Sequence, residues 1–226
     1  MTLSVIIPTY NEADIITDTI KHVRRCGNDI KEVIVADAGS HDETTSKAEA
    51  AGAVVVTTRK GRAAQMNTGA RRATGNILYF LHADSLPTEN FDDKIRDAVN
   101  RGYKAGCFQL CFDSDHFLLN LYAWFSRFDI DTFRFGDQSL YVTRSVFYEV
   151  GKFREDHLVM EDNEMVRRIK KEHSFAILDD KVKTSARAYM KGGVLRLQLI
   201  FVLIVLLYHL GTDQETLLHI RENATS

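Results

Sequence analysis

The sequence has few cysteines and no excess of charge of either sign. Its 226 residues include three cysteines, Cys26, Cys107 and Cys111. This odd and sparse set makes a poor disulfide framework and fits a reducing compartment. The spacing of Cys107 and Cys111 is not that of a zinc ribbon, so buried thiols are expected. Lysine and arginine number 29 against 31 aspartates and glutamates, a formal net charge of -2. This balance argues against a nucleic-acid-binding protein, which usually carries a basic excess.

The signatures of several other protein classes are also missing. No G-x-G-x-x-G fingerprint follows the first apolar segment, and no lysine-bearing phosphate loop occurs in the chain. These absences argue against a Rossmann dehydrogenase and a P-loop site. There is no internal repeat and no linker rich in proline or serine. The first residues lead into a strand-like segment without a basic stretch and a cleavable apolar core, so no signal peptide is expected.

An apolar run without charges, residues 199–208, is too short to cross a membrane by itself, since a spanning helix needs roughly 20 apolar residues. Arg196 and His209 border it. Because the run is apolar all round, a helix here would leave one face uncovered on a monomer surface. It is expected to be buried against the domain or a second subunit, or to lie on a membrane surface. Residues 194–210 therefore mark a predicted peripheral membrane contact or homo-oligomer interface.

The first half of the chain alternates strand and helix signals. Strands are predicted over residues 3–7, 32–36, 53–57 and 77–81, and Pro8 is expected to end the first of them. Between these strands, one helix is predicted after Asn11, a second up to Ala51 and a third over residues 61–73. Asn11 is expected to cap the first of these helices. The rhythm predicts an α/β fold with a parallel sheet and helices on both faces. Right-handed crossovers would bring the carboxyl ends of the strands to one edge.

The second half is less regular. Helices are predicted over residues 91–100, 116–128 and 160–171, and strands over 106–112, 139–142 and 175–178. We expect one continuous domain over residues 1–185 and a helical appendage over 186–226.

Acidic residues stand where predicted strands end. Asp84 follows the apolar strand 77–81, and Asp37 follows the second strand, with Gly39 close behind. Ligands of open α/β sheets bind just outside the carboxyl ends of the strands. Asp84 is therefore a candidate for meeting a phosphate-bound cation or a sugar hydroxyl, and Asp37 a base or ribose, with Gly39 letting the backbone come close. The alternative is that Asp37 only holds a turn and Asp84 only caps the turn or the helix after Pro87.

Three segments in their order and spacing carry a family resemblance: residues 5–12 (VIIPTYNE), 33–42 (VIVADAGSHD) and 79–84 (YFLHAD). They resemble family 2 glycosyltransferases, which are inverting enzymes of the GT-A fold, and the resemblance runs from residue 3 to about residue 185. It implies a Rossmann-like, mostly parallel sheet flanked by helices. Residues 61–70 (GRAAQMNTGA), 135–138 (FGDQ), 184–187 (TSAR) and 210–211 (LG) are similar to a small bacterial branch whose genes often accompany radical-SAM and selenium-related proteins.

The resemblance implies a nucleotide-sugar site. Pro8, Tyr10, Asn11 and Glu12 would line the base and ribose, Asp37 with Gly39 would contact the uracil or its equivalent, and Arg62 and Asn67 would approach the diphosphate or the sugar. Positive charge and free N–H groups at the start of a helix suit an anion there. The alternative for Arg62 is a solvated helix residue.

The resemblance also implies a divalent cation. His82, Ala83 and Asp84 stand where the family has its Asp-x-Asp motif, with His82 in place of the first acid. Asp84 would ligate Mn²⁺ or Mg²⁺ bridging the two phosphates, since Mg²⁺ commonly uses few protein ligands. His82 is expected to be packed or hydrogen-bonded rather than a metal ligand. Cation affinity without a nucleotide is therefore expected to be weak.

Glu161 and Asp162 open a predicted charged helix and resemble the family's acidic pair, whose aspartate is the general base. An inverting transfer needs one base to take the proton of the acceptor hydroxyl, and a metal neutralises charge on the leaving diphosphate. The alternative is that the two acids only complement the helix dipole. Asp137 would lie near the acceptor or order the base. Trp124, Phe125 and Phe128 would shape an acceptor pocket or, as such stripes more often do, belong to the core.

The sequence therefore predicts a metal-dependent inverting glycosyltransferase. It would transfer a sugar from a nucleotide-diphosphate sugar, UDP-linked, to an acceptor hydroxyl, in the cytoplasm or at the inner face of the membrane. The alternative is a non-catalytic nucleotide-sugar-binding protein of the same fold. A sugar-nucleotide-forming nucleotidyltransferase would need a glycine-rich loop with lysine or arginine after the first strand, where this chain has residues 9–12 (TYNE).

Overall fold

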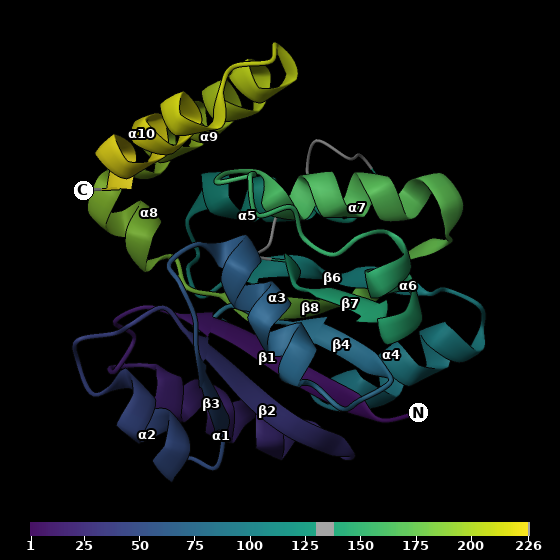
Figure 1. Ribbon diagram of the computed structural model, residues 1–226. Coiled ribbons are helices and arrows are strands. Elements are labelled where there is room, and N and C mark those ends of the chain that lie inside the picture. The colour runs from purple at the N-terminus through teal and green to yellow at the C-terminus, as the bar shows by residue number, and fades with distance from the viewer. Residues whose placement is uncertain (130–137, 226) are drawn as a thin grey trace.

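An eight-stranded sheet forms the centre of the molecule in a computed structural model that describes residues 1–129 and 138–225 (Figure 1). Its strands lie in the order β3-β2-β1-β4-β7-β6-β8-β5. The strands are β1 (Leu3–Thr9), β2 (Ile30–Asp37), β3 (Val54–Thr57), β4 (Ile77–Phe80), β5 (Ser85–Leu86), β6 (Ala105–Phe112), β7 (Leu140–Thr143) and β8 (Phe175–Thr184). The helices are α1 (Ile16–Cys26), α2 (Thr44–Ala50), α3 (Arg62–Arg72), α4 (Phe91–Asn100), α5 (Phe117–Phe125), α6 (Arg144–Glu149), α7 (Glu161–Glu172), α8 (Arg187–Gly192), α9 (Val194–His209) and α10 (Gln214–Thr225).

The first four strands and the helices between them confirm the predicted alternation. β1 pairs in parallel with β2 and β4, and β2 pairs in parallel with β3, so these strands end at one edge of the sheet. The prediction that Pro8 ends the first strand is wrong, because β1 continues to Thr9. Pro8 lies beyond the last register pair of β1 with β4, Ile6 with Phe80. Its missing N–H therefore removes no bond from that ladder.

Two strands, β5 and β7, run against the others. β7 is antiparallel to both β4 and β6, and β5 is antiparallel to β8, whereas β6 and β8 are parallel. The expectation that strands end at one edge therefore fails for β5 and β7. β5 follows β4 too closely for a crossover, which needs a dozen or more residues. β7 starts at Leu140 opposite the last residue of β4, Phe80, so the chain enters β7 from the edge where β4 ends. The mostly parallel α/β prediction is confirmed, although it missed β5 and α6 and ended β8 too early.

Apolar side chains alternate between the two faces of the sheet and form a core on each. In β1, Val5 and Ile7 belong to the core covered by α1, α4 and α5, whereas Ile6 belongs to the core covered by α3, α6 and α7. Gly69 brings α3 close to β1, since a Cβ at this position would lie 2.4 Å from Cγ2 of Ile6. This close approach positions the start of α3 beside the ends of β1 and β2.

The C-terminal helices confirm the predicted helical appendage. α9 and α10 lie side by side as a hairpin above the sheet in the view of Figure 1. A third apolar cluster joins this hairpin to the domain, with Ile204, Val205 and Leu217 packed on Val159 and Met160. The division into domains 1–185 and 186–226 stays a prediction. Across the described parts of the chain, every helix is too short or too polar to span a lipid bilayer.

Candidate functional site

The ends of β1 and β2 are tied together by a side chain from α3. Thr9 and Asp37 are register partners. Gln65, only 5% exposed, donates from Nε2 to the carbonyl oxygens of Thr9 (2.8 Å) and Ala36 (3.1 Å). Gln65 was not among the residues predicted for the site. The signal that could have indicated its role is that Gln65 is an amide next to apolar Ala63, Ala64 and Met66 in the first turn of a helix.

Asp37 turns its carboxylate into the protein. Its side chain is buried, and Oδ2 accepts hydrogen bonds from the backbone N–H groups of Gly39 (2.9 Å) and Ser40 (2.8 Å). Oδ1 accepts from the hydroxyls of Thr9 and Ser40. Gly39 has a φ of 79°, a conformation that glycine adopts without strain. Asp37 therefore holds the turn that follows β2, which is the alternative stated above, and its contact with a base stays a prediction.

The loop after β1 is bonded to the loop after β2. Asn11 does not cap α1, which begins at Ile16, so that prediction is wrong. Instead, Oδ1 of Asn11 accepts from the N–H of His41 (2.9 Å), and its own N–H donates to Oγ of Ser40 (2.8 Å). The neighbouring Tyr10 is 38% exposed, with Nζ of Lys60 4.5 Å from its ring centroid. A partly exposed aromatic ring from the loop after β1 and a cation from the segment before α3 thus lie together at the edge of the sheet.

Glu12 and Asp84 bring two half-buried carboxylates into the same region. Burial is the main cause of the raised pKa of Glu12; Arg187, 3.7 Å from Oε2, opposes the shift and the charge of Asp84 adds to it. Ala83 fixes the backbone before Asp84, since its carbonyl oxygen accepts from the hydroxyl of Thr19. Two half-buried carboxylates that repel each other favour a bound cation, and oxygen donors are what Mg²⁺ and related hard cations prefer. These residues therefore fit the divalent cation that the family resemblance implies.

Arg62, the first residue of α3, joins the start of α7 to the end of β4. Its Nε lies 3.0 Å from Oε1 of Glu161, and its Nη2 lies 3.0 Å from Oδ2 of Asp162. Nη2 also contacts Nε2 of His82. One guanidinium thus connects both acids of the predicted catalytic pair to the histidine of the predicted metal motif.

The two acids differ in their surroundings. Glu161 is fully buried, and burial raises the pKa of its carboxyl; the positive charge of Arg62 opposes the shift, and the negative charge of Asp162 adds to it. Asp162 keeps part of its side chain in solvent. Met160, before the pair, has a φ of 65°, a left-handed conformation that is uncommon for a residue with a long side chain. This bend starts α7 so that Glu161 points inward while Asp162 stays accessible.

A small cavity of about 20 Å³ lies beneath these residues. Its lining brings together Pro8 from β1, His82 from the end of β4 and Asp162 from α7, over a largely apolar floor. That volume is enough for about one water molecule.

Asn67, a predicted site residue, does not join this group. Asn67 is buried on α3 and holds the segment after Phe153: Nδ2 donates to the carbonyl oxygen of Phe153 (2.9 Å) and to Oε1 of Glu155 (3.0 Å), and Oδ1 accepts from the N–H of Phe153 (3.1 Å). The Asn67 amide is thus hydrogen-bonded to Phe153 and Glu155, and not directed to the predicted diphosphate position. Asp137 lies outside the described residues.

The C-terminal hairpin supports the start of α7 from behind. Oε1 of Gln214, the first residue of α10, accepts from the backbone N–H groups of Leu158 (2.9 Å) and Val159 (3.0 Å). Arg221, also on α10, interacts electrostatically with Glu161 and Arg62, and burial lowers the pKa of its guanidinium. Neither residue was predicted from the sequence, because a separation of more than 50 residues from their partners leaves no local pattern to detect.

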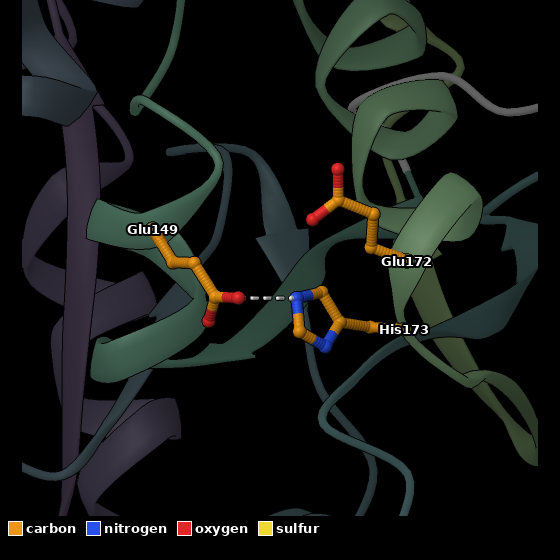
Figure 2. Close-up of side chains that lie close together, drawn as sticks. All are labelled: Glu149, Glu172 and His173. Atoms are coloured by element: carbon orange, nitrogen blue, oxygen red, sulfur yellow. Dashed lines mark ion pairs between the residues drawn. The ribbon is translucent and has the colours of Figure 1, made fainter.

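A second cluster of acidic and histidine side chains lies away from this site. Figure 2 shows Glu149 and Glu172 beside His173, with Nε2 of His173 3.5 Å from Oε1 of Glu149. Both glutamates are exposed. His173 follows α7, whereas Asp162 lies at its start, so about 16 Å of helix separates them at 1.5 Å per residue. The ion pair with Glu149 accounts for this arrangement, and it adds nothing to the group around Asp84.

The sequence of the first two thirds of the chain decides the family. The family model described as "Glycosyl transferase family 2" matches residues 4–155. The chain belongs to this family. In this family 2 chain the matched region carries Arg62 and Asp84 but ends before Glu161 and Asp162. Among curated proteins, no sequence matches this one.

Solved structures with the same fold confirm the GT-A prediction. The S. aureus TarS structure has a TM-score of 0.68 at 18% identity over 94% of this chain, which spans only 43% of the TarS chain. The mannosyltransferase PcManGT from Pyrobaculum calidifontis, in complex with GDP-Man and Mn²⁺, has a TM-score of 0.68 at 20% identity, covering 98% of this chain and 69% of its own. Glucosyl-3-phosphoglycerate synthase from Mycobacterium tuberculosis, in complex with Mn²⁺, UDP and phosphoglyceric acid, has a TM-score of 0.64 at 17% identity. The match covers 92% of this chain and 78% of the synthase chain. At these identities the likeness shows the fold alone.

Proposed function

We propose that this family 2 chain is an inverting glycosyltransferase that uses a nucleotide-diphosphate sugar, UDP-linked, and a divalent cation. The observation that carries the proposal is Arg62 between Glu161, Asp162 and His82, two residues before Asp84, whose charge in turn acts on Glu12. The Mn²⁺ and nucleotide complexes of the P. calidifontis and M. tuberculosis proteins, which share the fold, support it.

Asp162 is the proposed general base. Its Oδ2 is bonded to Arg62, so the acceptor hydroxyl would give its proton to Oδ1 while its oxygen attacks the anomeric carbon opposite the leaving diphosphate. A single base on the acceptor side is what an inverting transfer requires. Buried Glu161 would hold Arg62 in place, and through it the carboxylate of Asp162.

The donor would bind along the ends of β1, β2 and β4. Tyr10 offers an exposed ring to a base. Pro8 and Asp37 lie at the ends of β1 and β2, and the loops that follow these strands contain Asn11, Glu12 and Gly39. Arg62 would bind the diphosphate as a positive charge at the start of α3. Asp84, on the backbone fixed by Ala83, would hold Mn²⁺ or Mg²⁺, which when bound would neutralise the charge that develops on the diphosphate. Asn67 would act by supporting α3 rather than by touching the donor, and Asp137 stays a predicted acceptor-side residue.

Release of nucleoside diphosphate from a panel of UDP-, GDP- and dTDP-sugars, with Mn²⁺ or Mg²⁺ and simple hydroxyl acceptors, tests the proposal. Asp162→Asn should lower turnover by about 10²–10⁴, the usual contribution of a general base, and leave donor binding intact. Asp84→Ala should weaken binding of donor together with cation. Normal turnover by both variants would refute these roles.

The non-catalytic alternative makes a different prediction. Thermal unfolding with each nucleotide, with and without Mn²⁺, reports binding alone, since a ligand at about 100 times its dissociation constant stabilises the fold by roughly 2.7 kcal/mol. A shift with a nucleotide sugar but no turnover with any acceptor would favour a binding protein. Membership of the radical-SAM-associated branch and a cytoplasmic location stay predictions.

A further inference from the structure

α5 and α9 each expose a stripe of large apolar side chains. In each stripe the apolar residues recur at spacings of three and four, so each stripe follows one side of its helix. The first stripe covers α5 and continues to Phe128, and the second covers α9. The exposed fractions lie between 38% and 81% for Phe117, Leu121, Trp124 and Phe128 on the first stripe and Leu195, Leu199, Val202, Leu206 and Leu210 on the second. A large exposed apolar patch of this kind marks an interaction site.

The two stripes belong to one surface. A groove of about 350 Å³ runs between the helices, and Leu121 on α5 and Val202 and Leu206 on α9 are part of both the groove and the stripes. Nε2 of Gln198 donates to the carbonyl oxygen of Leu118 (3.2 Å), which holds α9 against α5. We call the two stripes together with their groove the α5–α9 face.

The two segments that form the α5–α9 face carry positive formal charges only, although exposed Asp115 precedes α5 and exposed Asp213, Glu215 and Glu222 lie at or on the neighbouring α10. Residues 185–212 contain Arg187, Lys191 and Arg196 and no acidic residue, and residues 116–128 contain Arg127 as their single formal charge. The guanidinium of Arg127 lies over the ring of Trp124 at 5.1 Å.

The acidic residues that flank α5 in the sequence are mostly engaged within the protein. Asp113 accepts from the N–H of Ala186 (2.6 Å), and Asp129 pairs with Lys170 (2.6 Å). Asp115 lies before the helix and is exposed. The border of the face therefore attracts anions.

We propose that the α5–α9 face binds the surface of an anionic lipid bilayer. Apolar side chains with a cationic border are what an interfacial helix presents to acyl chains and anionic headgroups. α9 has 16 residues, about 24 Å at 1.5 Å per residue, which suits a helix lying in the interface rather than crossing a hydrocarbon core of about 30 Å.

The alternative occupant is a second copy of the chain. A two-fold interface presents the same surface patch on both subunits, so the cationic border of one copy would meet the cationic border of the other. Like charges brought together in this way cost binding free energy, whereas anionic headgroups would complement them. The charge pattern therefore favours lipid.

The candidate site is connected to this face. Arg187, at the start of α8, reaches Glu12 at the end of β1, and Tyr189 of the same helix lines the groove. Docking would thus hold the donor site next to the bilayer. The proposal does not depend on the reaction proposed above, and binding can be measured without turnover.

Trp124 is the single tryptophan of the chain, so its fluorescence reports directly on this face. Added vesicles of phosphatidylcholine with phosphatidylglycerol should shift its emission to the blue, and the protein should sediment with them. Vesicles of phosphatidylcholine alone should bind more weakly, and added salt should abolish the difference. Absence of both the shift and cosedimentation with the anionic vesicles would overturn the proposal.

Variants separate the apolar contribution from the charged one. Leu199→Ser and Leu206→Ser should each weaken vesicle binding at least about tenfold, as expected for a leucine that loses its burial in acyl chains. Lys191→Gln and Arg196→Gln should each weaken binding to anionic vesicles about fivefold and leave binding to phosphatidylcholine unchanged. Tyr103→Ser is the matched control, because Tyr103 is as exposed as Phe128 but lies before β6, outside the face.

Two outcomes would count against lipid. The first is a protein that sediments as a dimer without vesicles, has Trp124 emission already blue-shifted, and becomes monomeric in Leu206→Ser; this would assign the face to a second copy. The second is vesicle binding that Tyr103→Ser weakens as much as Leu206→Ser does, which would show that the face is not the contact.

Discussion

Replacing Arg62 with methionine is expected to destabilise the protein more at high pH than at low pH. Methionine keeps much of the apolar stem and removes the guanidinium that lies 3.0 Å from both Glu161 and Asp162. Removing one partner of a buried ion pair costs about 3–5 kcal/mol. Arg62 is 34% exposed and Arg221 still acts on Glu161, so we expect about 2–3 kcal/mol near pH 8.

The pH dependence follows from Glu161. Burial raises the pKa of Glu161 above its ordinary 4.5, and Arg62 is the largest opposing influence, so Arg62→Met should raise that pKa further. A carboxyl with a raised pKa in the folded state contributes stability below its unfolded pKa and loses it as the pH rises through the folded value. The loss of stability in Arg62→Met should therefore grow with pH between the folded-state pKa of Glu161 in the unchanged protein and that in the variant, by up to about 1.4 kcal/mol per pH unit.

Urea unfolding near about pH 5 and about pH 8, the ends of the range in which proteins are usually most stable, measures this deficit. The set comprises the unchanged protein, Arg62→Met, Glu161→Gln and the double variant. Glu161→Gln removes the titrating carboxyl, so the double variant should lose the pH dependence and regain part of the stability at the higher pH. An equal deficit at both pH values, or a double variant as unstable as Arg62→Met near pH 8, would refute the reasoning.

Three further changes test the supports of the site. Gln214→Met removes both hydrogen bonds to the backbone of residues 158–159, so it should lower the free energy of unfolding by about 1–3 kcal/mol in thermal unfolding. It should also lower kcat with little change in donor KM. The control is Tyr148→Phe, which removes one hydrogen bond to the backbone of Ala70 on another part of the fold and should cost less stability and leave kcat unchanged. Asn67→Ala should destabilise by about 1–3 kcal/mol for the lost amide bonds, and donor KM should rise far less than in Arg62→Met; equal rises would place Asn67 at the donor after all. Gly69→Ala should destabilise by about 1–3 kcal/mol through overpacking on β1, and an unchanged melting temperature would mean that α3 can move away from the sheet at no cost.

The strand-end residues could be predicted because their positions follow from local patterns. Apolar runs that end in Asp37 and in Asp84 mark the carboxyl ends of parallel strands, and register then brings Thr9 beside Asp37. The direction of a side chain at such an end is a different matter. Asp37 faces inward because two N–H groups of its own turn and two hydroxyls reach it, and no periodicity records where those donors lie.

The contacts made by Arg62 could not be predicted, because its partners lie far along the chain. Asp162 is 100 residues away and His82 is 20 residues away, and the sequence assigned Arg62 to the donor rather than to the acids. The antiparallel entry of β7 was missed for a related reason. Its direction depends on where the preceding segment ends in space, and a short apolar run carries no sign of that.

The bonds from Gln214 impose an order in time on the assembly of the site during synthesis. Residues 158–159 are synthesised 55 or more residues before Gln214, which is about 3–11 s at the usual rates of elongation. In that interval the parallel half of the sheet and Arg62 are already made, but Val159 and Met160 lack their apolar cover from Leu217. A chain that ends before residue 214 therefore contains the residues of all eight strands but lacks the helix that supports the segment before its proposed base.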